Sequence, residues 1–315
     1  MILRLIAARI GMSVFLLLGV SIIVFAGTEL LPGDVAQMIL GQGATRAAVA
    51  ALRAQLHLNE PGWLRYLHWL GGLVTLHLGR SLVNDMPVTR LIAGRLDNSL
   101  LLALFTTIVT VPAALLVGIT AAVWRDSLYD RILNVLTMAT VSVPEFLFAT
   151  LAVLVFAVDL HWLPALSYRV DLGSAGRVLR EFTLPVITLA LAIFAQMARM
   201  TRAALVNTLD ASYIEMAVLK GVRPLRLVLH HALPNAVGPI ANAVALSLSF
   251  LLGGVVVVET IFAYPGLAKL MVDAVSTRDM PLIQACAMIF SAGYLLLVLI
   301  ADVIAILANP RLRHR

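Results

Sequence analysis

The sequence predicts an all-α membrane protein with six transmembrane helices, and three observations lead to this fold class. Hydrophobic residues make up 61% of the 315 residues and charged residues only 13%, whereas about a quarter of the residues in a soluble domain are charged. The hydrophobic residues also gather in long runs without the period-two alternation of a membrane β-barrel. Because lipid cannot hydrogen-bond the backbone, such runs must form helices.

Six apolar runs come close to the ~20 residues that a helix needs to cross the hydrocarbon core. The first run follows Arg4 and Arg9 and so has the beginnings of a signal peptide. It is longer than the roughly 7–15 apolar residues of such peptides, so we expect it to be retained, with cleavage as the alternative. The six expected spans are residues 10–31, 99–123, 132–158, 184–200, 237–258 and 283–308.

One long segment outside the membrane, residues 32–98, follows the first span. Thr45 is placed to cap a short helix that runs to Leu56. A second short helix is predicted by an apolar stripe with helical spacing, formed by Trp63, Tyr66, Leu67 and Leu70. Such a stripe is usually a buried face, so we expect it to pack over the external ends of the spans, with docking of a partner as the alternative.

The segment between the fourth and fifth spans carries the most informative pattern. Glu215, Ala217 and Gly221 are spaced so that a helix of under two turns precedes a glycine, at which the chain leaves the helix. Leu233 and Pro234 follow shortly before the next span. We expect this segment to display a short helix at the membrane surface, where a partner can dock on it.

Positive charge predicts the orientation of the spans. Lysine and arginine concentrate at residues 4–9, 125–131, 199–226 and 311–315, which six spans would place on one side of the membrane. By the positive-inside rule this side is the cytoplasm, so both termini and the loop at 203–236 are expected there. The net charge of +6 therefore needs no nucleic acid to explain it.

Several motifs, taken in order along nearly the whole chain, make it similar to a known family. They include Leu31-Pro32-Gly33-Asp34, Leu78-Gly79-Arg80-Ser81, Ser142-Val143-Pro144-Glu145-Phe146 and the run from Glu259 to Leu267. With the pattern at Glu215, they make the chain resemble the dipeptide, oligopeptide and nickel permeases of binding-protein-dependent ABC importers. The likeness is to the first of the two membrane subunits. Val218 stands where that family usually has an arginine.

The resemblance implies a type I importer permease fold, with residues 1–98 as the first helix and external loop and residues 99–315 as a five-helix core. It also implies a second homologous permease subunit, two ATPase subunits, an external substrate-binding protein and a bacterial inner membrane. Di- or oligopeptides are the implied substrates, while nickel chelates, glutathione and opines remain open. The residues that it assigns to contact with the ATPase are Glu215, Ala217, Lys220, Gly221, Leu233 and Pro234.

The chain itself carries no pattern typical of an enzyme. Neither of its two lysines, Lys220 and Lys269, lies in a phosphate-binding loop. His230 and His231 lack the spacing of a zinc protease site, and the single Cys286 provides no thiolate cluster. We therefore expect no metal or cofactor in this chain, and ATP and Mg²⁺ to be bound by the partner ATPase subunits.

Acidic residues in apolar segments are candidates for a translocation path, because an ionisable group within a span costs ~2.5–3.5 kcal/mol. Glu145 follows Pro144 in the third span, and Glu259 ends the fifth. For Glu145, contact with the ammonium group of a passing peptide and a hydrogen bond to a neighbouring helix are both open. For Glu259 a structural role is favoured.

Two other functional classes serve as alternatives to an ABC importer subunit. An ion-coupled secondary transporter would carry inverted repeats with helices interrupted at the midplane, and the two halves of this sequence show no convincing repeat. An intramembrane hydrolase would need two convergent catalytic groups, whereas Glu145 and Asp302 are expected at different depths.

Overall fold

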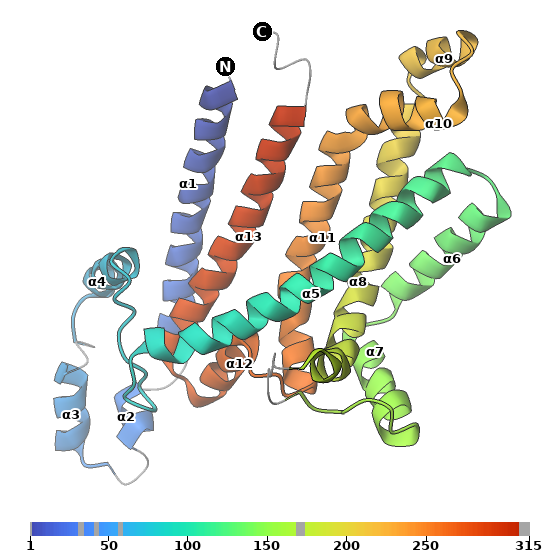
Figure 1. Cartoon of the computed structure of the whole chain (residues 1–315). Coiled ribbons are helices and arrows are strands. Elements are labelled where there is room, and N and C mark those ends of the chain that lie inside the picture. The colour runs from blue at the N-terminus through green and yellow to red at the C-terminus, as the bar shows by residue number, and fades with distance from the viewer. Residues whose placement is uncertain (1, 31–34, 41–43, 56–58, 168–173, 309–315) are drawn as a thin grey trace. The chain divides into compact units, whose positions relative to one another are not determined.

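The computed structural model is all-α within the residues that it describes, as the composition predicts (Figure 1). The motif at 31–34, the helix end expected at Leu56 and the basic residues of 311–315 lie outside the described residues, which are 2–30, 35–40, 44–55, 59–167 and 174–308. The chain forms two compact units. Unit 1 consists of Met1–Ser13, Ser99–Pro265 and Tyr294–Arg315, and unit 2 consists of Val14–Asn98 and Gly266–Gly293.

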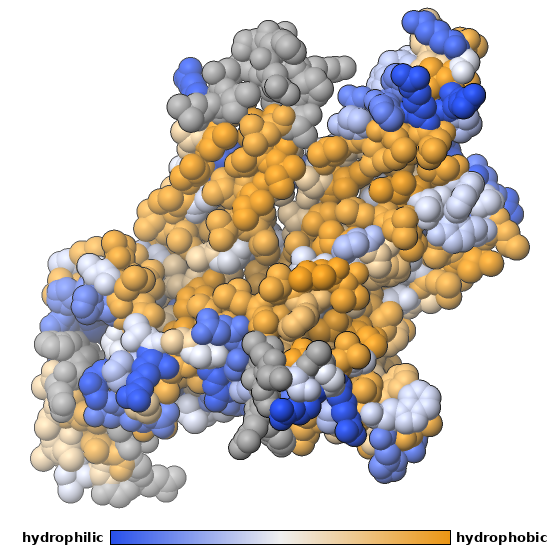
Figure 2. All heavy atoms as spheres, viewed as in Figure 1, coloured by the Kyte–Doolittle hydropathy of each residue, from blue (hydrophilic) through white to orange (hydrophobic). Residues whose placement is uncertain are grey.

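Five unbroken helical stretches in the described ranges are long and apolar enough to cross a membrane. Each includes most or all of a predicted span and extends beyond it. Much of their exposed surface is apolar, as Figure 2 shows, which is expected of side chains that face lipid rather than water. The stretches are α1 (Ile2–Glu29), α5 (Val88–Val123), α8 (Ala175–Leu209), the run from α10 (Pro224–Arg226) through η2 (Leu227–Ala232) to α11 (Leu233–Ile261), and α13 (Met280–Ala308).

The predicted third span, residues 132–158, is a pair of helices with a break between them rather than one straight helix. It consists of α6 (Leu128–Ser142), α7 (Glu145–Ala152) and a π-helical continuation, η1 (Val153–Asp159), with a bend of 94° between α6 and α7. The cause is Pro144, which lacks an N–H and forces the residue before it out of the helical conformation. Val143 accordingly has φ −93° and ψ 125°.

The segment that the sequence places outside the membrane forms three short helices in its described residues, α2 (Val35–Leu40), α3 (Arg46–Gln55) and α4 (Gly62–Val74). The predicted cap is confirmed, because the Thr45 hydroxyl accepts a hydrogen bond from the Ala48 N–H at 3.2 Å. The two predicted helices are present as α3 and α4.

Helix α4 packs on the end of α1 through part of its apolar stripe. The Tyr66 ring meets Phe25 edge to face, with centroids 5.5 Å apart, and its hydroxyl lies 2.9 Å from the Ser21 oxygen. Trp63, by contrast, is 66% exposed, and Leu67 is exposed as well. The expected packing over the end of a span is therefore found for Tyr66, while Trp63 and Leu67 face outward and Leu70 is half-buried.

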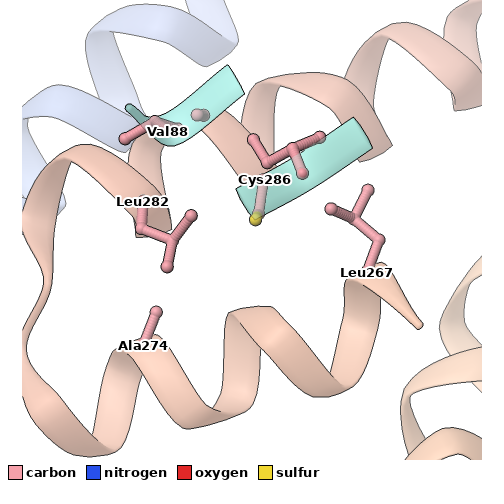
Figure 3. Close-up of a cluster of buried hydrophobic side chains, with 7 residues drawn as sticks. Val88, Leu267, Ala274, Leu282 and Cys286 are labelled. Atoms are coloured by element: carbon pink, nitrogen blue, oxygen red, sulfur yellow. The ribbon is translucent and has the colours of Figure 1, made fainter. Parts of the chain in front are cut away.

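Unit 2 is held together by an apolar cluster around α12 (Leu267–Thr277) and by one buried carboxylate. Figure 3 shows Val88, Leu282 and Cys286 converging on α12. Nearby, Asp279 accepts hydrogen bonds from the Ser81 hydroxyl and from the Leu82 N–H, the latter at 3.1 Å. These bonds tie the segment before α5 to the corner between α12 and α13.

In unit 1, α5 and α8 come close together at Gly118. A Cβ atom at this position would lie 2.6 Å from the Ala198 carbonyl oxygen and 2.8 Å from Thr201 Cβ, so only glycine fits without a backbone shift. Small residues at helix contacts let backbones approach closely in membranes. Helix α8, which leads into the segment with the Glu215 motif, is thereby packed closely against α5.

Candidate functional site

The segment with the Glu215 motif forms a short helix, α9 (Ser212–Leu219), directly after α8 (Figure 1). Ile214 and Ala217 are buried, whereas Glu215, Met216 and Leu219 are exposed, Leu219 to 75%. The predicted short displayed helix is therefore present. Its exposed side combines one carboxylate with large apolar side chains, which on a protein surface mark a site for a partner.

The buried side of α9 packs against the ends of the long helices. Ile214 belongs to a buried cluster with Leu205 of α8, Ala122 of α5 and Ala236 of α11. Because three of the long helices meet at Ile214, a displacement of α9 must move or deform their ends. This packing connects an exposed surface to the membrane-spanning helices of unit 1.

The end of α9 is fixed by Gly221 in the way that the motif predicts. Gly221 has φ +77°, and its N–H donates to the Val218 carbonyl at 2.9 Å. The Val222 N–H donates to the Ala217 carbonyl at 3.2 Å. These two bonds form a Schellman motif, which satisfies the last carbonyls of the helix. Ala217 thus contributes both its small side chain to the packing and its carbonyl to the cap.

Leu233 and Pro234 lie at the start of α11 rather than in a loop. Much of the loop expected at 203–236 is helical, because α8 reaches Leu209, α9 follows, and helix resumes again at Pro224. The turn before Pro234 is the π-helix η2, whose wider spacing accompanies the N–H that proline lacks. Leu233 packs against the buried cluster of Ile214, so both ends of the motif meet the same core.

A basic hollow of about 650 Å³ lies beside the end of α9. Lys220, Arg223, Arg226 and His230 line it together with apolar residues such as Leu225. The sequence motifs select only Lys220 from this group for contact with the ATPase, while the two arginines enter through the positive-inside rule alone. The close spacing of these four residues in the sequence, at positions 220, 223, 226 and 230, is the signal that could have grouped them.

Glu145 is the first residue of α7, at the bend after Pro144. Its carboxylate lies against Gly254 of α11, where a Cβ atom would be 2.7 Å from Oε2, and beside Leu189 of α8. Among the residues that the structure describes, Glu145 has no hydrogen-bond or ion-pair partner. The hydrogen bond to a neighbouring helix, one of its two predicted roles, therefore has no donor in the described chain.

Glu259 has a different environment. It is fully buried near the end of α11, and its Oε1 accepts a hydrogen bond from the Ser99 hydroxyl of α5. The Glu259 carbonyl also accepts from the Tyr264 N–H at 2.9 Å. These contacts agree with the structural role favoured for Glu259, and they leave its carboxylate without access to solvent in this conformation.

Comparison with known proteins identifies relatives over the whole chain. Residues 114–314 match the family model described as binding-protein-dependent transport system inner membrane component, and residues 2–103 match the model of the N-terminal part of such components. A putative peptide transport system permease protein of Brucella melitensis is 36% identical over 100% of both chains. Glutathione transport system permease proteins of Salmonella typhi and Escherichia coli are each 37% identical, over 95% and 94% of both chains.

The cap at Gly221 predicts a specific response to substitution. Gly221→Ala should loosen α9, because a residue with a Cβ atom pays ~1–2 kcal/mol in the left-handed region, whereas Gly221→Asn should loosen it less. Hydrogen exchange of residues 212–222, followed by mass spectrometry, should be roughly 5–30-fold faster in the alanine variant. Gly253→Ala, which meets open space in α11, is the control. Equal exchange in the alanine, asparagine and wild-type proteins would contradict the role given to this cap.

Proposed function

The chain belongs to the family of inner membrane components of binding-protein-dependent transport systems, and on this premise we propose that it carries di- or oligopeptides into the cytoplasm. As a member of that family it is a permease subunit of an ABC importer, a multi-pass protein that works with a substrate-binding protein and an ATPase. This membership decides against the secondary transporter and the intramembrane hydrolase.

The proposed assembly pairs this chain with a second, homologous permease subunit, two ATPase subunits that bind ATP and Mg²⁺, and a periplasmic substrate-binding protein. The absence of a phosphate-binding loop from the sequence supports ATP hydrolysis in separate subunits. Peptides are favoured as substrates because one relative is named for peptide transport. Glutathione is the second candidate, because other relatives are named for it and it is itself a small peptide.

Helix α9 is the proposed docking site for the ATPase. The proposal is carried by the two sides of this helix, one exposed and the other packed against the long helices. The exposed side offers Glu215 between apolar side chains, while Ile214 and Ala217 anchor the helix to the ends of α5, α8 and α11. A movement of the ATPase could therefore reach the spans through α9. In this scheme ATP binding and hydrolysis switch the permease pair between two accessible states.

The proposed translocation path passes Glu145. Its carboxylate lies at a helix break, beside a glycine, and without a partner among the described residues. A charge in such a place is costly unless water or a substrate reaches it. The positively charged amino terminus of a peptide is a suitable partner, and Glu259, which is already bonded to Ser99, is the less suitable of the two candidates.

Both termini and α9 are proposed to lie in the cytoplasm. In unit 1, Arg9 near the start of α1 forms an ion pair with Asp302 near the end of α13, with an N to O distance of 3.0 Å. Figure 1 shows these two ends and α9 at the same end of unit 1. The arginines that surround them favour the cytoplasmic side.

Orientation can be tested with introduced cysteines, because Cys286 is fully buried and should not react. Cysteines at Leu219 and Leu128, which are 75% and 74% exposed, should be labelled only by reagents that reach the cytoplasm, and a cysteine at Trp162, 64% exposed, only from outside. Labelling of positions 128 and 162 from the same side would mean that α6 and α7 form a re-entrant loop rather than a broken span.

Docking can be tested at Glu215. If this carboxylate pairs with a basic group of the ATPase, Glu215→Ala should leave that group buried and unpaired, at a cost of ~2–5 kcal/mol. We expect less ATPase to co-purify with the permease, and ATP hydrolysis stimulated by the binding protein to fall with it. Ser212→Ala, on the same helix, should leave both values unchanged. Wild-type co-purification and hydrolysis in the Glu215 variant would remove α9 from the docking site.

The path and the substrate class can be tested together in proteoliposomes that contain the whole importer. Glu145→Gln should reduce uptake of a dipeptide with a free amino terminus, while uptake of its N-acetylated form should be unaffected. Gly254→Ala should act in the same direction by displacing the carboxylate, whereas Gly253→Ala meets open space and should not. Equal loss with both peptides would contradict contact with the amino terminus, and import of glutathione but neither dipeptide would reassign the substrate.

A further inference from the structure

Two ion pairs tie the turn between α5 and α6 to the last turns of α8. In the first, the Arg202 guanidinium group of α8 donates two hydrogen bonds to the Asp130 carboxylate of α6, from Nε to Oδ1 and from Nη2 to Oδ2, each at 2.6 Å. In the second, Arg125 Nη1 lies 2.9 and 3.0 Å from the two carboxylate oxygens of Asp210. Neither pair was singled out by the sequence patterns.

The pair of Asp130 and Arg202 is the stronger of the two, because Asp130 is buried and each of its carboxylate oxygens accepts two hydrogen bonds. Asp130 is 2% exposed. Besides Arg202, it accepts from the Asp126 N–H and from the Asn134 amide, each at 3.0 Å. A planar, bidentate contact of this kind resists both rotation and separation of the two side chains. A lysine in place of the arginine would not resist rotation.

The two ion pairs matter for function because they lie close to the start of α9. Arg202 and Asp210 are eight residues apart, about 12 Å along a helix, and Asp210 caps the end of α8. Ala211, the next residue, is the N-cap of α9. The two pairs therefore hold α6 to the part of α8 from which α9 emerges.

The opposite end of α6 lies at the bend that carries Glu145. Helix α6 is 15 residues long, begins at Leu128 beside the ion pairs and ends at Ser142, just before Pro144. Glu145 follows and lies against Gly254 and Leu189. One short helix thus connects the base of α9 to the carboxylate of the proposed path, with a fixed attachment at one end and a proline break at the other.

We propose that Asp130 and Arg202 are positioning residues that transmit a displacement of α9 to α6 and through it to Glu145. The proposal rests on the proposed function of α9 as the docking site of the ATPase. The pair makes α6 follow the end of α8, and the break at Pro144 lets α6 change its angle to α7 without unfolding either helix. Arg125 and Asp210 support the same attachment at the surface.

The test uses the complete importer with the double variant Asp130→Asn, Arg202→Gln, which removes both charges and so leaves neither one buried alone. We expect normal co-purification of the ATPase and continued ATP hydrolysis, but at least tenfold less peptide imported per ATP hydrolysed. Arg202→Lys, which keeps the charge but loses the second hydrogen bond, should give an intermediate ratio of peptide imported to ATP hydrolysed. The control is Arg9→Gln, Asp302→Asn, which removes an ion pair between α1 and α13 and should leave the ratio unchanged.

A second measurement separates transmission from simple support of the fold. Spin labels on α6 at Met138 and on α9 at Leu219, both exposed, can each be paired with a label on α13 at Ile300. In the wild type ATP should change both distances. In the double variant it should change only the distance from α9.

Each outcome decides between the two proposals. If the ATPase is bound and the distance from α6 still changes as in the wild type, or if import per ATP is unchanged, the transmitting role of Asp130 and Arg202 is wrong while docking on α9 stands. If the wild-type importer shows no change in the distance from α9, the proposed function of α9 itself is wrong. Equal loss of import in the double variant and in the Arg9 control would mean that ion pairs here only support the fold.

Discussion

The demand of the backbone for hydrogen bonds inside lipid is the constraint on which this structure depends. A helix meets it within itself, so any interruption at membrane depth leaves groups that must be satisfied in another way. The chain has prolines within its helices at Pro112, Pro185 and Pro239, where the helix continues. At Pro144 it does not, and the carboxylate of Glu145 lies next to that break. The carboxylate and the interrupted backbone, each of which is costly in lipid, therefore lie at the same point of the chain.

Small residues determine how the surface helix is joined to the membrane-spanning helices. Ala122, Ala232 and Ala236 share one buried cluster with Ile214, and Ala217 of α9 is buried as well. With short side chains on both sides, the backbones come close and the contact has little freedom to slide. Gly118 does the same between α5 and α8. A close, stiff contact of this kind is what a helix needs if a force on its exposed side is to reach the spans.

Periodic features of the chain could be predicted from the sequence, and features that depend on three-dimensional neighbours could not. Apolar runs identify the spans because burial in lipid depends on length and composition alone. The cap at Thr45 and the turn at Gly221 follow from local chemistry and are found where the sequence places them. The bend at Pro144 could have been expected, but its angle depends on the helices around it.

The ion pairs are the clearest case of what sequence patterns leave hidden. Asp130 and Arg202 are 72 residues apart, and each looks like an ordinary charge at the end of an apolar run. Only the packing of α6 on α8 brings them together. The same holds for Gly254, whose role is visible only because the Glu145 carboxylate occupies the space that a side chain would fill.

A comparison of the buried and half-buried carboxylates gives the strongest argument for a function at Glu145. Asp130 is neutralised by an arginine, Glu259 accepts from the Ser99 hydroxyl, and Asp279 accepts from a hydroxyl and a backbone N–H. Each of these compensates part of the cost of removing a carboxylate from water. Glu145 lacks any such partner among the described residues, although it lies in an apolar segment. Because the protein can satisfy a carboxylate where it serves the fold, the one left unsatisfied at the bend is the one that we propose for contact with a ligand.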